Sequence, residues 1–213
     1  ERNIRAELVD AGLQVLAVAA VMAFLAVVVI VVFTAFKIGK PLTAFARGID
    51  ILCEKPIADS MEAVVRIARK VNAAQRKMAV TMSHRFDADK TTLRHIVRSG
   101  VLGKINAIGC RFQGDMRQHM AWSSLFRHQM RDPLLVEGAI HHLDIIADLA
   151  GARCETLYAS MWKPTWAEYA GDTDGVVTMV FENGVRAVYE GSCTNAVGLN
   201  TFYKEYIRVD GEM

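Results

Sequence analysis

The hydrophobic residues of this chain form three kinds of pattern, and the first is a long apolar run. From Leu13 to Phe36 no side chain is ionisable and most are aliphatic. A helix of this length crosses about 30 Å of hydrocarbon, so the run predicts a transmembrane helix in preference to a signal peptide or a buried core helix. Lys37, Lys40 and Arg47 follow before any acidic residue. This positive charge predicts a single-pass inner-membrane protein whose residues after 36 are cytoplasmic.

The second pattern begins after residue 50, where short apolar runs alternate with an amphipathic segment. Residues 51–57 read as a strand that ends at a charged turn, Glu54-Lys55-Pro56. A helix over residues 61–76 follows, capped by Asp59-Ser60, and residues 77–82 form the next strand. A strand, helix, strand unit belongs in a parallel sheet whose ligands bind at the carboxyl ends of the strands. The charged turn is therefore expected at the functional edge.

The third pattern is an apolar stretch over residues 134–151 with a single polar seam. At about 100° per residue, four polar side chains of this stretch fall within roughly 60° of arc. They are Glu137, His141, Asp144 and Asp148. Carboxylates and histidines are seldom buried without partners, so we expect the seam of this helix to open on a cleft that holds a polar ligand. His142 points about 100° away from the seam and is predicted to be a packing residue.

Alternating and β-branched segments dominate the remainder of the chain and predict an antiparallel sheet. These segments cover residues 155–161, 175–181, 185–191 and 205–210. Asn183-Gly184 lies between two of them and is a strong hairpin signal, because both residues tolerate the positive φ that a two-residue turn requires.

Composition and charge narrow the function. The net charge of +2 and the dispersed basic residues argue against a nucleic-acid-binding protein. The four cysteines are far apart and are predicted to be reduced core residues. Glu137, His141 and Asp144 could ligate a metal, but no second cluster supplies further ligands, so no metal site is predicted. Four other histidines are predicted to be solvated: His84, His95, His119 and His128.

Two resemblances follow from these motifs. Residues 1–50, with Pro41 at a helix start, resemble the exit of a chemoreceptor membrane helix into a HAMP module. Residues 51–213 resemble the Gfo/Idh/MocA family of NAD(P)-dependent oxidoreductases, through four motifs in the family's order. The motifs are Glu54-Lys55-Pro56, His84-Arg85-Phe86, residues 100–105, and Glu137-x-x-x-His141-x-x-Asp144. The second resemblance implies hydride transfer between NAD or NADP and a sugar, cyclitol or related polyol-like substrate.

The resemblance to this oxidoreductase family also implies roles for single residues. Lys55 would polarise the reacting oxygen, with Glu54 and Pro56 shaping the cofactor pocket. His141 would be the general acid or base, since imidazole titrates near neutral pH. Glu137 stands where the family more often has Asp, and it would orient substrate or His141. Arg85 and Asp144 would complete the substrate site, although Asp144 and Asp148 are equally explained as structural partners.

The implied fold class is α/β (α+β), with three parts. Residues 1–50 form the transmembrane helix and HAMP-like start, residues 51–84 a residual Rossmann βαβ unit, and residues 85–213 a mixed or antiparallel β-sheet substrate domain with helices. In the family such a sheet also forms a homo-oligomer interface. Residues 1–50 contain no Gly-rich turn of the kind that holds a dinucleotide pyrophosphate. Two alternatives to an enzyme therefore remain, a membrane-anchored ligand-binding or regulatory protein and a chemoreceptor fragment.

Overall fold

The computed structural model of the chain describes residues 47–58, 60–117 and 125–213. These residues divide into two compact units. The smaller unit holds residues up to 53 together with residues 60–79, and the larger holds residues 54–59 and 80–213. Each unit is described below by itself.

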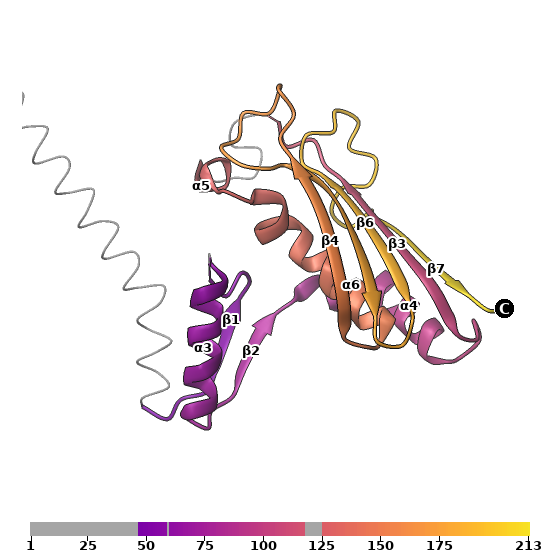
Figure 1. Cartoon of the computed structure of the whole chain (residues 1–213), viewed down its shortest axis with the longest axis horizontal. Helices are drawn as coiled ribbons and strands as arrows, with labels where there is room; N and C mark the ends of the chain where they lie inside the picture. Colours follow the sequence, from indigo (N-terminus) through magenta and orange to yellow (C-terminus); the bar gives the residue numbers. More distant parts are fainter. Residues whose placement is uncertain (1–46, 59, 118–124) are drawn as a thin grey trace, which may run out of the picture. The chain divides into compact units, whose positions relative to one another are not determined.

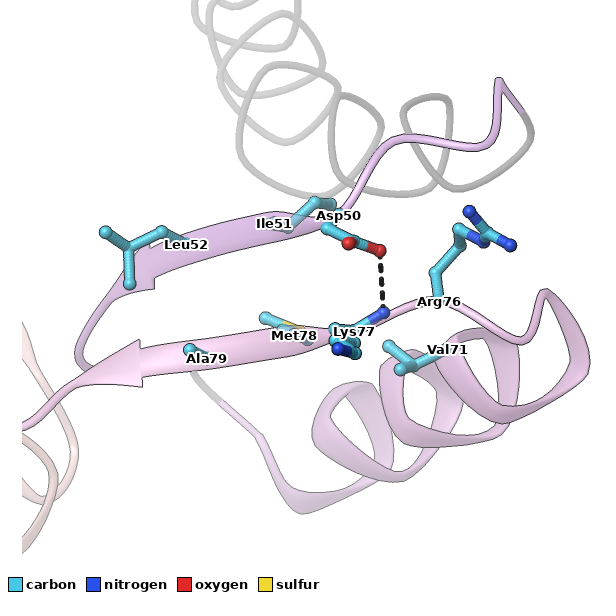
Figure 2. Close-up of a pocket in the computed structure, with 8 residues that line it drawn as sticks. All are labelled: Asp50, Ile51, Leu52, Val71, Arg76, Lys77, Met78 and Ala79. Carbon is cyan, nitrogen blue, oxygen red and sulfur yellow. Dashed lines mark hydrogen bonds between the residues drawn. The ribbon is translucent and has the colours of Figure 1, made fainter.

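The smaller unit contains the strand, helix, strand order that the sequence predicts. Strand β1 (Ile51–Glu54) is followed by helix α3 (Met61–Ala73) and strand β2 (Met78–Thr81), which pairs with β1. Figure 2 shows both strands running in the same direction, as in a parallel pair. Ser60 caps α3 as predicted, because its hydroxyl accepts a hydrogen bond from the Ala63 amide at 3.3 Å.

Helix α3 ends three residues earlier than the sequence predicted. Its last residue is Ala73, and Gln75 takes a left-handed conformation with φ of 51°. The turn that follows leads into β2, where the Lys77 amide donates to an Asp50 carboxylate oxygen at 2.9 Å. The pattern of residues 61–76 gave no sign of this stop, because Gln75 and Arg76 are residues that favour helices.

The larger unit is built on a five-stranded sheet in the order β4-β5-β6-β3-β7 (Figure 1). Its strands are β3 (Ile105–Gln113), β4 (Cys154–Trp162), β5 (Asp174–Phe181), β6 (Arg186–Ser192) and β7 (Tyr206–Gly211). Strands β3 and β6 pair in parallel and the other pairs are antiparallel. The sheet is therefore mixed. The sequence predicted four of its strands and missed β3, the strand that makes the parallel pairing.

Helices cover one face of this sheet, as Figure 1 shows for α6 and α4. They are α4 (Ala88–Arg98), the short α5 (Leu125–Gln129), a π-helical segment η3 (Leu134–Ala139) and α6 (Ile140–Ala150). The core lies between α6 and the sheet. Alternate residues of β3, β5 and β6 point into it, among them Phe112, Val177 and Tyr189.

The predicted helix over residues 134–151 is two segments instead of one. Residues 134–139 wind as a π-helix, and an α-helix continues from Ile140 to Ala150. Gly151 ends it with φ of 67°, which favours glycine. A π-helical turn rotates the residues before it relative to those after it. Of the polar seam, Glu137 therefore lies in the π-helical segment, whereas His141, Asp144 and Asp148 lie in the α-helix.

The hairpin signal at Asn183-Gly184 is confirmed. Gly184 takes φ of 86°, and the Phe181 amide donates to the Val185 carbonyl across the turn at 2.9 Å. The Asn183 side chain also donates to the carbonyl of Ala150 at 2.8 Å. The turn therefore fixes the register of β5 and β6 and ties them to the end of α6.

The predicted inner-membrane location requires a correction. Among residues 47–58, 60–117 and 125–213, no helix combines the length and the apolar character needed to cross a bilayer. The longest, α3, has 13 residues, which is shorter than the roughly 20 that a spanning helix needs. The run from Leu13 to Phe36 and the HAMP-like start up to residue 46 lie outside the described residues.

Candidate active site

The polar seam of η3 and α6 is the centre of the candidate site. Its four side chains face the short 3-10 helix η2 (Ser83–Phe86), α4 and α5, which supply their partners. The sequence predicted that a ligand would satisfy the buried carboxylates of the seam. The structure instead gives every carboxylate of the seam at least one arginine partner.

Glu137 is held between two cations. Its Oε1 accepts hydrogen bonds from Arg127 at 2.9 Å from Nε and 2.6 Å from Nη2. The Lys55 ammonium lies 3.4 Å from the same oxygen and donates to the Glu137 carbonyl oxygen at 2.8 Å. The Glu137 side chain is only 9% exposed. One carboxylate thus fixes the position of the lysine that the family resemblance places at the reacting oxygen.

Asp144 and Asp148 connect α6 to the elements that follow β2. Arg85 donates from Nε to Asp144 at 2.9 Å and makes a second, parallel hydrogen bond from Nη2. Asp148 pairs with Arg94 and, at 3.1 Å, with Arg98. Such two-point pairing of guanidinium and carboxylate holds both groups in a fixed plane. Of the two roles left open by the sequence, this geometry favours structural pairing for both aspartates.

His141 is the seam residue whose imidazole keeps an unused nitrogen. The residue is 5% exposed, and its Nδ1 is buried with no hydrogen-bond partner among the described residues. Burial, together with the nearby His84, Lys55 and His142, lowers the pKa of His141 to about 3 against an opposing effect of Glu205. His141 is therefore a neutral imidazole at physiological pH. That is the form that can accept a proton.

A second group of polar side chains, which the sequence did not reveal, lies behind His141. The buried Glu205 carboxylate accepts hydrogen bonds from Lys90 Nζ at 2.8 Å and from the Tyr203 amide at 3.1 Å. His142 Nε2 is 3.4 Å from Glu205 Oε1, the oxygen that also accepts from the Tyr203 amide, and His142 Nδ1 is 3.2 Å from the Tyr189 hydroxyl. Burial raises the pKa of Glu205, but the hydrogen bonds from His142 and Lys90 outweigh it and lower the value to about 2.

A lysine supplies the positive charge in this buried group. The atoms of His84, His142 and Glu205 that could bind a metal ion lie within 4.8 Å of one another. The Lys90 ammonium, whose side chain is 2% exposed, sits directly on the Glu205 carboxylate. The positive charge that a buried carboxylate requires is thus supplied by a side chain.

Two histidine predictions need correction, and a third is confirmed with an addition. His84 and His128 were expected to be solvated, yet they are 7% and 4% exposed. His142 is buried as a packing residue would be, but it also takes part in the hydrogen bonds to Glu205 and Tyr189. His95 is exposed as expected, and His119 lies outside the described residues. The position of His84 just after β2, at the carboxyl end of a predicted parallel strand, was a signal that could have marked it.

The remaining predicted site residues lie at the end of β1. Glu54 is the last residue of the strand and is exposed, and the peptide bond between Lys55 and Pro56 is cis. Within residues 47–58 and 60–117, no Gly-rich turn lies beside them. The hollow that Figure 2 shows in the smaller unit is elsewhere. Its lining includes Asp50, Arg76 and Lys77, at the amino ends of β1 and β2, opposite to the edge where a dinucleotide binds.

The predicted cysteine environment holds in part. Cys110 and Cys193 are buried core residues, whereas Cys154 is exposed and Cys53 partly so. Cys110, Cys154 and Cys193 are free thiols. Burial raises the pKa of Cys110 to about 12 and keeps this thiol protonated. The two buried cysteines are therefore packing residues.

Comparison with known proteins identifies the sheet unit. Residues 91–212, more than half of the chain, match the family model of the GFO/IDH/MocA C-terminal domain. Protein y4oX of Sinorhizobium fredii, itself uncharacterized, is 58% identical over 169 residues, which cover 79% of this chain and 47% of y4oX. Inositol 2-dehydrogenase of Corynebacterium glutamicum is 28% identical over 144 residues, 67% of this chain and 40% of that enzyme. The chain thus spans about half the length or less of these relatives.

Solved structures share the fold. An oxidoreductase from Agrobacterium radiobacter, in complex with NAD+, L-tartaric acid and magnesium, superposes with a TM-score of 0.74 at 18% identity, covering 84% of this chain and 51% of that one. An inositol dehydrogenase homolog from Azotobacter vinelandii, with NADH and myo-inositol, gives a TM-score of 0.68 at 19% identity, covering 83% and 46%. The chemoreceptor resemblance and the two non-enzymatic alternatives find no support, since the matched family is one of oxidoreductases.

Proposed function

This chain belongs to the GFO/IDH/MocA oxidoreductase family, and we propose on that basis that it carries the substrate site of an NAD-dependent dehydrogenase acting on a polyol. The proposal rests on one observation: Glu137 holds the Lys55 ammonium at 3.4 Å, and the same lysine lies near enough to His141 to lower its pKa. A fixed cation can stabilise the developing alkoxide and a neutral imidazole can accept the hydroxyl proton when an alcohol is oxidised, while the cofactor accepts the hydride.

The roles of the side chains follow from their charges. The Lys55 ammonium would stabilise the negative charge that develops on the hydroxyl oxygen as its proton leaves. His141 would accept that proton, because it is unprotonated at neutral pH. Glu137 would position Lys55, since its carbonyl and carboxylate oxygens both contact Nζ. Reduction of the ketone would use the same groups in reverse.

A bound nicotinamide cofactor would take up the hydride from the carbon that carries the hydroxyl. The described residues fit the nicotinamide end of this cofactor but not its pyrophosphate. Glu54, Lys55 and Pro56 stand at the carboxyl end of β1, where the nicotinamide would lie, and no Gly-rich turn for the pyrophosphate is found in residues 47–117. NAD is proposed over NADP because both solved relatives described above hold NAD+ or NADH.

Two parts of the original site prediction stay proposals. Arg85 would take part in substrate binding only by way of Asp144, because its guanidinium is occupied by the pair with that residue.

A homo-oligomer through the sheet is proposed from its outer face, where Tyr158, Val188 and Tyr206 are exposed. Light scattering of the purified chain tests the oligomer, and a monomer at all concentrations would reject it.

The function is tested in two steps with the purified chain. Tryptophan fluorescence is followed during titration with NADH and with NADPH, and we expect saturable quenching by NADH. Hydride transfer is then assayed with NAD+ and either myo-inositol or L-tartrate, the ligands of the two solved relatives. Turnover that is abolished by His141→Ala supports the proposal. Turnover that persists in that variant would overturn the assignment of His141.

A further inference from the structure

His84 and His141 form a stacked pair of buried imidazoles. Their ring centroids are 4.1 Å apart and the planes differ by 11°. His84 comes from η2 and His141 from α6, and both are less than a tenth exposed. Phe202 lies edge-on to the His84 ring at 5.4 Å, and Tyr203 is tilted against it at 5.0 Å. The His84 ring is therefore fixed from several sides, and it in turn fixes the plane of His141.

The pair also shares an unusual hydrogen-bonding state. The Nδ1 atoms of both rings are buried, and neither has a hydrogen-bond partner among the described residues. Two parallel imidazoles at this distance cannot both be positively charged without strong repulsion. The charges around each ring therefore decide which of them accepts a proton first.

Two carboxylates, those of Glu205 and Asp87, lie near His84. Glu205 Oε1 is 3.8 Å from His84 Nδ1, and Asp87 also attracts positive charge on this ring. Lys90 and His142 oppose them, but Lys90 is already paired with Glu205 at 2.8 Å. Both carboxylates belong to segments packed directly against η2.

The surroundings of His141 have the opposite character. Lys55, His84 and His142 all disfavour a positive charge on this ring, and Glu205 is the one described side chain that favours it. Glu137 lies one turn earlier on the same seam. Its carboxylate is taken up by Arg127 at 2.6 Å and by Lys55 at 3.4 Å. The geometry thus gives His141 no carboxylate of its own.

We propose that His84 is a positioning residue for His141: it fixes the plane of the His141 ring, and on acidification it is the first of the two rings to take a positive charge, so that His141 remains the neutral base of the pair. This inference rests on the proposed role of His141 in proton transfer. It adds a residue that stands between the proposed base and the buried Glu205 carboxylate.

The direction of the pKa shifts agrees with this assignment. Burial lowers the pKa of His84, and the nearby Asp87 and Glu205 carboxylates act against that effect. Burial also lowers the pKa of His141, to about 3, and His84 is the next largest cause. Protonation on lowering the pH therefore begins at His84, and the charge it gains makes His141 still harder to protonate.

The order of protonation can be measured directly in the wild-type chain. Imidazole nitrogen and carbon shifts are followed by NMR from pH 8 downward in ¹³C,¹⁵N-labelled protein, with no cofactor or substrate present. We expect His84 to titrate at a higher pH than His141. A His141 midpoint equal to or above that of His84 would overturn the proposal.

A variant then tests whether His84 is the cause. His84→Phe keeps a flat ring on His141 and removes the imidazole charge, so the His141 midpoint should rise by about one pH unit or more. His128→Phe is the matched control, because His128 is equally buried and stacks on Tyr169 at 4.2 Å. An unchanged His141 midpoint in His84→Phe, or an equal rise in the control, would reject the role of His84.

Two features keep this test independent of folding and of the proposed activity. Far-ultraviolet circular dichroism and the dispersion of the NMR spectrum establish that each variant is folded. If His84→Phe does not fold, the order of protonation in the wild-type chain decides the proposal. Because no turnover is measured, a chain without dehydrogenase activity can still show the predicted order. Loss of activity in His141→Ala together with a reversed order would retain the proposed function and reject the role of His84.

Discussion

Arg85 and Asp144 form a two-point ion pair that joins η2 to α6, one turn from His141. The two residues are 59 positions apart in the chain, and the aspartate side chain is 16% exposed. The pair brings the residues after β2 against the polar seam. It therefore sets the relative position of His84, which precedes Arg85, and His141, which precedes Asp144.

Removal of this ion pair should destabilise the larger unit. Arg85→Met leaves the Asp144 carboxylate without its main partner, and we expect a loss of about 1–3 kcal/mol in the free energy of unfolding. Urea denaturation followed by circular dichroism measures it. Arg131→Met is the control, since Arg131 is 95% exposed and only 3.7 Å from Asp132, and surface pairs of this kind contribute about 0–1 kcal/mol. Equal losses in both variants would show that the Arg85–Asp144 pair stabilises the fold no more than an exposed surface pair does.

Glu205 should make stability depend on pH in the acid range. Its pKa in the folded chain is about 2 against an ordinary value of 4.5. A lowered pKa means that the stabilisation is complete above about pH 4.5 and is lost as the pH falls toward 2. We expect the difference in unfolding free energy between wild type and Glu205→Gln to reach on the order of 2 kcal/mol at pH 7 and to shrink below pH 4.5. A difference that does not change with pH would contradict this role.

Lys55 should matter for turnover far more than for folding. If the proposed function holds, Lys55→Met removes the cation at the reacting oxygen, and we expect kcat to fall by about 100-fold or more. The free energy of unfolding should change little by comparison. Lys163→Met is the matched control, because Lys163 also donates to a backbone carbonyl, that of Tyr169 at 2.9 Å. A similar fall in kcat for both variants would remove Lys55 from the site.

The hairpin between β5 and β6 offers a test of backbone conformation alone. Gly184 has φ of 86° and no heavy atom within 4 Å of an added Cβ. Gly184→Ala should therefore cost about 1–2 kcal/mol through strain and nothing through contacts. At Gly109, where no positive φ occurs, an added Cβ would meet Arg208 Cβ at 3.9 Å, an ordinary contact. Thermal unfolding should thus separate Gly184→Ala from a nearly neutral Gly109→Ala.

Local patterns in the sequence were enough to predict the elements. The Ser60 cap, the strand pair that follows residue 50 and the hairpin at Asn183-Gly184 each depend on residues a few positions apart, and the structure contains all three. Strand β3 was missed although its buried positions, Ile108, Cys110 and Phe112, alternate as they do in the strands that were predicted. The location predicted from the run at residues 13–36 was wrong. It was inferred from the hydropathy of that run alone, and the described residues contain no helix that could cross a bilayer.

The polar seam shows the same division within one site. The sequence determined that Glu137, His141, Asp144 and Asp148 share a face, since helical periodicity requires it. Only the tertiary structure decided which partners meet that face: Arg127 and Lys55 at Glu137, Arg85 at Asp144 and the His84 ring on His141. Periodicity is a property of neighbours along the chain. Charge compensation and stacking in a buried site join residues that are distant in sequence, and packing of the sheet against its helices selects them.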